Sequence, residues 1–287
     1  MEYRGWQPQA AWAQTVAVSQ QADRLGFESI WLYDHFHTVP LPADEIVFEP
    51  FTALSALAAL TRRVRIGHIV ICTGFRNPAL TAKMISTLDT ISGGRAELGI
   101  GAGWKQEEWL AYGYAFPTTH QRLAALADHL EVITRMLEGG DTERATFSGR
   151  YARVAGAINR PKPIQRPRVP VMVGGNGPNV TWRLAARYAD ELNLDGLTPT
   201  EVAAALPVIR SRCEEIGRDP ATLRLSVNIG RDTYGVPGAA RVELLAAYRD
   251  VGVVRVMGLL QASATSDEAL AALAEDARAA GCKLFGG

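Results

Sequence analysis

Apolar and polar positions follow one repeating order along most of the chain: an amphipathic segment, a glycine or polar break, a short apolar run, and a loop. Apolar spacing of three to four residues predicts helices, and bounded apolar runs predict buried strands. The predicted helices span 10–25, 50–61, 78–91, 119–137, 178–188, 200–216, 239–251 and 267–280. The predicted strands span 29–33, 64–71, 96–100, 171–173, 191–194, 223–229 and 253–260.

Several boundaries carry local signals. Gly26 stands where a helix-ending glycine belongs, and Asn77 followed by Pro78 is typical of a capped helix start. Leucine and isoleucine recur on one face of the predicted helix 119–137, which indicates a buried face.

Strands that alternate with helices and read as apolar runs indicate an α/β protein with a parallel sheet. This order alone fits both a doubly wound sheet and a (β/α)8 barrel. Residues 139–169 interrupt the order with four glycines and several prolines. We interpret them as an insertion, such as a small hairpin over one end of a barrel, and expect 1–287 to be a single domain.

An α/β barrel has eight strands and opens with one, whereas this chain opens with a helix and has seven predicted strands. Residues 1–9 include Gly5, Pro8 and two charges, unlike a buried strand. We therefore expect the first barrel strand to be absent. Three explanations are open: the protein starts upstream and Met1 is internal, neighbouring strands or 139–169 close the gap, or a partner subunit covers it. The first is favoured, because each buried unpaired backbone group costs about 1–3 kcal/mol.

Composition narrows the function classes. Of 287 residues, 47% are apolar, and 30 basic side chains balance 30 acidic ones. This balance gives no electrostatic reason to expect nucleic acid or an anionic membrane as partner. No apolar run approaches the ~20 residues of a membrane helix, and the first residues lack the apolar core of a signal peptide. Three scattered cysteines indicate a reducing compartment, so we expect a cytoplasmic protein.

Two glycine-containing loops follow predicted strands. Residues 98–104 have the spacing G-x-G-x-G, which differs from the dinucleotide pattern G-x-G-x-x-G, and a helix follows where that motif needs a strand. We interpret these glycines as allowing a tight turn or close approach to a ligand. In residues 173–181, a strand ends in glycines and a helix is predicted to open at Pro178. Free N–H groups and the helix dipole there suit a phosphate, with Thr181 adding a hydroxyl; the alternative is an ordinary tight loop.

Asp34, His35 and His37 follow the strand 29–33. A His-x-His pair at a strand end could bind a metal, but such sites need further ligands from later strands. The remaining histidines all lie in the first half of the chain, so we predict no metal site. The alternatives are that Asp34 and His35 line a pocket as hydrogen-bonding or proton-handling groups, or that the histidine only caps a loop.

Four blocks in this order resemble the luciferase-like family, and in particular its F420-dependent oxidoreductases. They are residues 25–36, 76–83, 88–104, and Pro163 with 170–177, and the resemblance covers most of 20–235. It implies a (β/α)8 barrel that binds coenzyme F420 or FMN at its C-terminal face, and a homodimer.

The resemblance also implies site residues. Asp34 and His35 would lie beside the deazaflavin ring, and Asn193 would assist at the sixth strand end. The third strand end, where members often have a non-prolyl cis peptide behind the ring, corresponds to Val70, Ile71 and Thr73. The phosphate-binding residues would be Gly174, Gly175, Asn176, Gly177, Asn179, Val180 and Thr181.

Trp104 belongs to this expected cofactor site, although some members carry an acidic catalytic group there. Glu107 or Glu108 could take that role, but first-turn helix residues of this kind are more often solvated. Trp104, Phe75 and Trp31 are candidate apolar walls, and Trp31 is equally suited to the core.

We expect hydride transfer between F420 and a small organic substrate, with His35 as the proton partner and Asp34 orienting it or contacting the ring. The alternatives are an FMN-dependent monooxygenase, a metal-dependent barrel hydrolase using His35 and His37, and a binding protein that keeps the fold. The sequence does not name the substrate.

Overall fold

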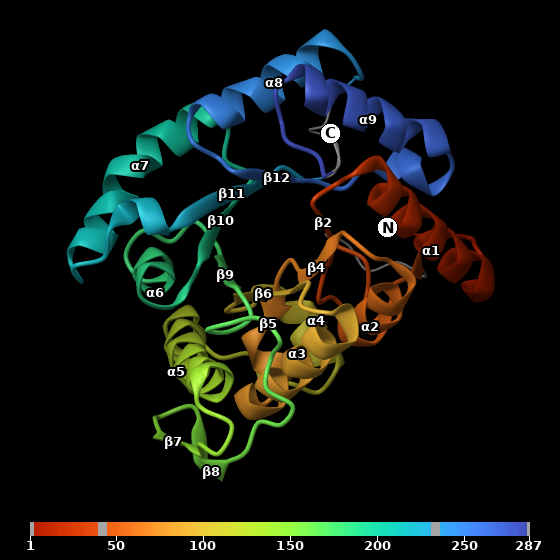
Figure 1. The fold of residues 1–287 in the computed structure, drawn as a ribbon. Coiled ribbons are helices and arrows are strands. Elements are labelled where there is room, and N and C mark those ends of the chain that lie inside the picture. Colours follow the sequence, from red (N-terminus) through yellow and green to blue (C-terminus); the bar gives the residue numbers. More distant parts are fainter. Residues whose placement is uncertain (1–2, 40–44, 231–235, 286–287) are drawn as a thin grey trace.

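A curled parallel sheet lies at the centre of the computed structural model, which describes residues 3–39, 45–230 and 236–285 (Figure 1). Its strands are hydrogen-bonded in the order β2, β4, β6, β9, β10, β11, β12, and β5 pairs with β6. The strands are β2 (Ser29–Leu32), β4 (Arg65–His68), β5 (Ile71–Cys72), β6 (Ala96–Gly101), β9 (Val171–Gly174), β10 (Glu191–Asp195), β11 (Arg224–Asn228) and β12 (Arg255–Met257).

Helices surround the sheet on its outer side (Figure 1). They are α1 (Pro8–Leu25), α2 (Pro50–Leu60), α3 (Pro78–Ser92), α5 (Thr119–Glu138), α6 (Thr181–Tyr188), α7 (Pro199–Glu214), α8 (Ala239–Asp250) and α9 (Asp267–Ala279). The short helix α4 (Gln106–Ala111) lies at the carboxyl ends of the strands. The short 3₁₀ turns are η1 (Thr73–Phe75), η2 (Pro220–Thr222) and η3 (Gln261–Ala264). This is the predicted barrel-type α/β architecture.

Three predicted elements differ from the structure. The predicted strand 64–71 is divided into β4 and β5, with a cis peptide between Ile69 and Val70. The helix predicted to open at Pro178 begins at Thr181, because residues 178–180 form a turn. Only Arg255–Met257 of the predicted strand 253–260 pairs with a neighbouring strand.

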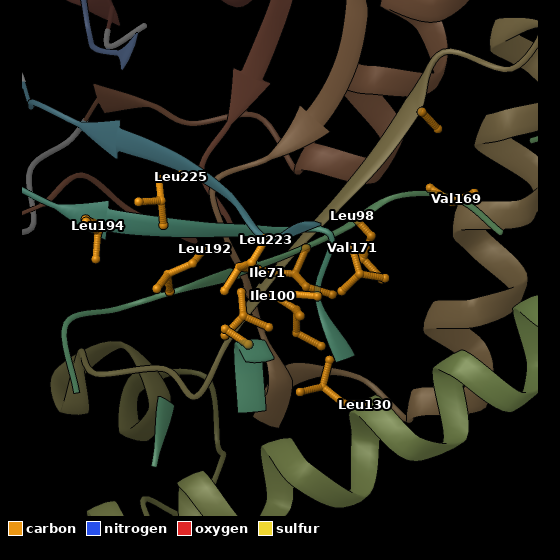
Figure 2. Packing of buried hydrophobic residues seen from close by; sticks show 14 of the residues in the cluster. Ile71, Leu98, Ile100, Leu130, Val169, Val171, Leu192, Leu194, Leu223 and Leu225 are labelled. Carbon is orange, nitrogen blue, oxygen red and sulfur yellow. The ribbon is translucent and has the colours of Figure 1, made fainter. Parts of the chain in front are cut away.

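The apolar core lies between the outer face of the sheet and the helices (Figure 2). Ile100, Val171 and Leu192 come from neighbouring strands, and Leu130 of α5 reaches toward them from the helix layer. All four side chains are buried. Burial on both faces explains why the parallel strands read as apolar runs in the sequence.

The insertion forms a hairpin, as predicted. β7 (Ala145–Ser148) pairs antiparallel with β8 (Arg153–Ala157) and lies beside α5 (Figure 1). Asp128 of α5 accepts hydrogen bonds from the backbone N–H of Tyr151 at 2.7 Å and of Ala152 at 3.2 Å. Because this hairpin packs on a helix and pairs with no strand of the main sheet, the explanation that 139–169 closes the barrel is wrong.

The main sheet is open between β12 and β2, which do not pair. Near the N-terminus, β1 (Tyr3–Arg4) pairs antiparallel with β3 (Glu45–Ile46), outside the parallel sheet. Among the described residues of this segment, 3–9, none belongs to the parallel sheet, as predicted. An apolar groove of about 260 Å³ lies at the opening, lined by β2, β12, α1 and α9.

Arg255 of β12 connects the two sides of this opening. Its guanidinium donates to Glu28, just before β2, at 2.8 Å, and to Glu97 of β6 at 2.7 Å. A third bond reaches Glu191 of β10 at 3.2 Å. The side chains of Arg255, Glu97 and Glu191 are at most 4% exposed. The guanidinium also lies 5.2 Å from the ring centroid of Trp31 in β2. One cation therefore links four strands.

The two buried carboxyl groups respond differently to Arg255. Burial raises the pKa of Glu97, but the guanidinium groups of Arg255 and Arg65 outweigh it, so the pKa lies below its usual range. For Glu191, burial is the largest effect and Arg255 only partly offsets it, so that pKa is raised. Arg255 is the one cation among the described residues that contacts both groups.

Replacing Arg255 with Met should destabilise the fold by about 3–5 kcal/mol, because it leaves buried carboxylates without their shared cation. The loss should be larger at pH 8 than at pH 5, since the unpaired carboxyl groups gain protons more easily at lower pH. Urea unfolding at both pH values measures it.

Arg224→Ala is the matched control, because this arginine also pairs with Glu191 but is 41% exposed. We expect it to cost less than about 1 kcal/mol. An Arg255→Met variant as stable as this control would contradict the linking role of Arg255.

Candidate active site

The carboxyl ends of the strands surround a cavity of about 590 Å³. This is the face on which α/β barrels carry their active sites. Its lining comes from loops far apart in sequence. It consists of Tyr33, Asp34, His35, Val39, Ile69, Val70, Ile71, Cys72, Phe75, Gly101, Ala102, Gly103, Trp104, Lys105, Glu108, Trp109, Gly174, Gly175, Asn176, Asn193, Asp195, Asn228 and Leu259.

His35 is paired with Glu108 at this cavity. The His35 Nδ1 atom lies 2.8 Å from Glu108 Oε2, and Glu108 is only 1% exposed. The other carboxylate oxygen accepts from the backbone N–H of Phe36 and, at 3.4 Å, from that of His37. The interpretation of Glu108 as a solvated helix residue is therefore wrong: α4 turns this side chain inward beneath the loop that follows β2.

These bonds set the protonation of the pair. Burial raises the pKa of Glu108. The hydrogen bonds from His35 and from the Phe36 N–H together lower it by more, so the pKa lies below its usual range. A carboxylate only accepts hydrogen bonds, so His35 Nδ1 must carry the hydrogen between them. The described residues give His35 Nε2 no partner, which leaves this nitrogen available to a ligand.

The Asp34 carboxylate has no hydrogen bond to the His35 ring among the described residues. Its carboxylate is held by both terminal nitrogens of Arg76, at 2.7 and 2.9 Å, and by the Cys72 N–H at 2.8 Å. Arg76 also donates to Glu49 at 2.8 Å. The hypothesis that Asp34 orients His35 is therefore wrong. Asp34 instead ties the end of β2 to the segment after β5, which forms one wall of the cavity.

Val70 lies across the ends of two strands. A Cβ atom built on Gly101 of β6 would lie 2.8 Å from Val70 Cγ2, and one on Gly174 of β9 would lie 3.0 Å from Cγ1. The glycines therefore leave space for this side chain. A Cβ on Gly99 would lie 1.9 Å from the His68 carbonyl oxygen. The first two glycines of the G-x-G-x-G pattern thus serve close packing of β6 against its neighbours. Gly103 follows β6 and has a φ of +77°, which fits the predicted tight turn.

Some polar groups of the predicted phosphate loop already form hydrogen bonds within the protein. The Gly175 N–H donates to the Asn193 carbonyl at 3.0 Å. The side-chain amide of Asn176 bonds both backbone groups of Asp195, at 2.7 and 2.9 Å. These two residues fasten the end of β9 to β10, so their bonded groups are not available to an anion.

Gly177 and Thr181, beyond the same end of β9, remain available to a ligand. A Cβ on Gly177 would lie 2.9 Å from Thr181 Oγ1. Thr181 is 7% exposed, and among the described residues its hydroxyl has no hydrogen-bond partner. Asn179 and Val180 belong to the exposed turn just before α6 and are not part of the cavity lining. Asn176 is thus the last residue of this loop that lines the cavity, and residues 177–181 lie beyond its edge.

Some of the other predicted residues line the cavity, and others lie behind its wall. Ile71, Phe75 and Asn193 line the cavity. Trp104 is 61% exposed and meets the His35 ring edge-on, 6.1 Å between centroids. Thr73 does not line the cavity, because its hydroxyl donates to the Gly101 carbonyl at 2.7 Å.

Trp31 also lies outside the cavity lining and packs in the barrel interior against Gly67. His37 Nδ1 bonds the Thr38 carbonyl at 2.9 Å. Within residues 3–39, 45–230 and 236–285, no three metal-binding side chains gather in one place. A search of the same ranges finds no helix with the length and apolar character of a membrane span.

A family model for luciferase-like monooxygenases matches residues 2–248. The chain belongs to this family. It is 32% identical over 216 residues to an F420-dependent glucose-6-phosphate dehydrogenase of Kineococcus radiotolerans. That alignment covers 73% of the chain and 60% of the relative, so the chain spans less than two thirds of that enzyme.

The fold is shared with several solved structures. An F420-dependent secondary alcohol dehydrogenase, in complex with an F420-acetone adduct, has a TM-score of 0.82 at 19% identity, covering 94% of this chain and 95% of that one. A monooxygenase from Streptomyces bottropensis has a TM-score of 0.71 at 20% identity, covering 92% of each. The barrel fold expected from the resemblance is confirmed, as is the cis peptide before Val70.

Replacing Glu108 with Gln should destabilise the protein at pH 7 by about 1–3 kcal/mol, because the buried bonds lose their charged acceptor. The pKa of Glu108 is lowered by folding, so its contribution is present above the unfolded value of 4.5 and disappears as the pH falls through the folded pKa. The difference from wild type should therefore shrink at low pH, as measured by urea unfolding between pH 7 and pH 3.5.

Glu107→Gln is the control, because Glu107 neighbours Glu108 but its side chain is 69% exposed. It should behave as wild type at pH 7. A Glu108→Gln deficit that does not change with pH would mean that the charge of Glu108 is not what holds this loop.

Proposed function

We propose that this protein is an F420-dependent oxidoreductase that transfers a hydride between coenzyme F420 and a small organic substrate. The observation that carries the proposal is the His35–Glu108 pair, which leaves one imidazole nitrogen available beside a cavity at the C-terminal face. Membership of the luciferase-like family, and F420-dependent relatives within it, support the same function.

The residues present fit this cofactor. A cavity of about 590 Å³ lies within the ~300–1,000 Å³ usual for ligand pockets. Val70 and Ile71 would lie against the ring, and Gly177 with Thr181 would receive the phosphate. A Cβ at Gly177 would occupy the space beside the Thr181 hydroxyl, as expected where backbone must approach an anion. When bound, F420 supplies the ring carbon that accepts or donates the hydride.

His35 would handle the substrate proton. When an alcohol is oxidised, His35 Nε2 takes the hydroxyl proton as the hydride leaves the adjacent carbon; in the reverse direction it returns that proton to the carbonyl oxygen. Glu108 keeps Nδ1 protonated and stabilises the imidazolium that forms. Trp104, Phe75 and Trp109 provide apolar walls that limit the entry of water.

An FMN-dependent monooxygenase is the second candidate, because the family model describes monooxygenases and several structural neighbours are monooxygenases. FMN offers a similar ring and phosphate to the same cavity. We further infer a single-domain cytoplasmic homodimer acting on a small molecule. The three free cysteines and the balance of charges are compatible with this.

Fluorescence titration of the purified protein with F420, FMN and zinc separates the candidates. We expect F420 to bind more tightly than FMN, and zinc not to bind stoichiometrically. In Gly177→Val, both cofactors should bind about tenfold or more weakly, because the added side chain meets Thr181 where the phosphate must approach; a tenfold loss is about 1.4 kcal/mol. Tight binding of FMN alone would favour the monooxygenase, and binding of neither cofactor would reject the proposal.

His35→Ala should lower turnover about 10²–10⁴-fold, the usual share of a general acid–base group, with cofactor affinity close to wild type. Turnover is followed by F420 absorbance with the first substrate found among small alcohols, ketones and sugar phosphates. His37→Ala is the control, since this ring bonds the Thr38 carbonyl and does not line the cavity. Near-normal turnover in His35→Ala would remove His35 from the reaction.

A further inference from the structure

Two arginines hold the turn before α6 from its outer side. Arg212 of α7 donates from Nε to the Pro178 carbonyl at 2.9 Å. Arg183 of α6 donates from Nη1 to the Asn179 carbonyl at 2.6 Å. Two successive carbonyl groups of the turn are therefore fixed by guanidinium groups.

One carboxylate holds both guanidinium groups in place. Glu215, directly after α7, accepts from Arg183 Nε at 2.8 Å and also bonds Arg212 Nη1. Arg212 is mostly buried, with 15% of its side chain exposed. We call Arg183, Glu215 and Arg212 the clamp. It connects the end of α7 to the turn that starts α6.

The clamp fixes where the N–H groups of the turn point. In a trans peptide the carbonyl and the following N–H point in opposite directions. With the carbonyls of Pro178 and Asn179 directed to the clamp, the N–H groups of Asn179 and Val180 are directed away from it. The described residues give neither N–H a partner, so both are available to an anion.

A side chain at the same turn independently indicates a ligand. Thr181 is 93% buried, from an exposed fraction of 7%, yet its hydroxyl has no partner among the described residues. It faces the space beside Gly177 that a Cβ would fill. The hydroxyl can therefore donate a hydrogen bond to a phosphate oxygen that enters this space.

We infer that the clamp positions the backbone N–H groups that bind the cofactor phosphate; this rests on the proposed function. Arg183, Glu215 and Arg212 are positioning residues: their bonds reach the turn's carbonyls, on the side opposite the ligand. Their effect should depend on the phosphate of the cofactor and not on its ring.

If the clamp acted only through its charges, one variant would change phosphate binding in the opposite direction. Glu215→Ala removes a negative charge near the turn, so long-range attraction alone would strengthen phosphate binding. If the clamp acts by positioning, the same variant frees both arginines and weakens phosphate binding. Glu215→Ala therefore distinguishes the two roles by the sign of its effect.

The experiment compares cofactor pairs with and without phosphate. F420 is titrated against its phosphate-free deazaflavin core, and FMN against riboflavin, with wild type, Arg212→Ala, Glu215→Ala and Arg210→Ala. The ratio of affinities within each pair gives the contribution of the phosphate. We expect this ratio to fall about three- to tenfold in Arg212→Ala and Glu215→Ala, the size of one hydrogen bond, while affinity for the core is unchanged.

Arg210→Ala is the matched control, because Arg210 is an exposed arginine of the same helix with no bond to the turn. Its ratio should equal that of wild type. An unchanged ratio in Arg212→Ala, or a raised ratio in Glu215→Ala, would overturn the inference while leaving the proposed function intact. Wild-type protein that binds neither F420 nor FMN would overturn both. Unchanged affinity for the phosphate-free core shows that each variant is folded.

Discussion

Arg255 lies where the sheet is open, and its guanidinium is bonded to carboxylates before β2, on β6 and on β10. β12 and β2 are not paired with one another, so this buried cation links the two sides of the opening, alongside the packing of α1 against α9. The curvature of the sheet decides how near the strand ends lie to each other. This ionic connection at the opposite end of the barrel therefore helps to set the shape of the cavity at those ends.

The curled sheet explains how a site is assembled from distant segments. His35 follows β2 and Glu108 belongs to α4, yet the two side chains are hydrogen-bonded. Asp34 does not share in this pair and instead fixes the Cys72 N–H and Arg76, so that Val70 stands against the glycines of β6 and β9. Adjacent residues after one strand thus have separate partners: His35 pairs with Glu108, and Asp34 holds the wall of the cavity.

Much of the fold was predictable, because parallel strands buried on both faces read as apolar runs. The ion pairs were not predictable, since the apolar pattern of the sequence indicates that a segment is buried but does not show which group a side chain bonds. Glu108 reads as a solvated first-turn residue until the loop after β2 covers it. Arg255 and Glu97 stand inside apolar strands, and a charge in such a run was the signal that a buried network exists. The break between β4 and β5 left no trace in the apolar pattern.

The central claim is that the cavity beside His35 holds F420. A crystal structure of the protein with F420 tests it most directly. We predict the ring between Val70 and the His35 Nε2 atom, with the phosphate over the turn from Gly177 to Thr181, bonded to the Thr181 hydroxyl. A ring bound elsewhere, for example in the groove between β2 and β12, or a phosphate that does not contact this turn, would contradict the account.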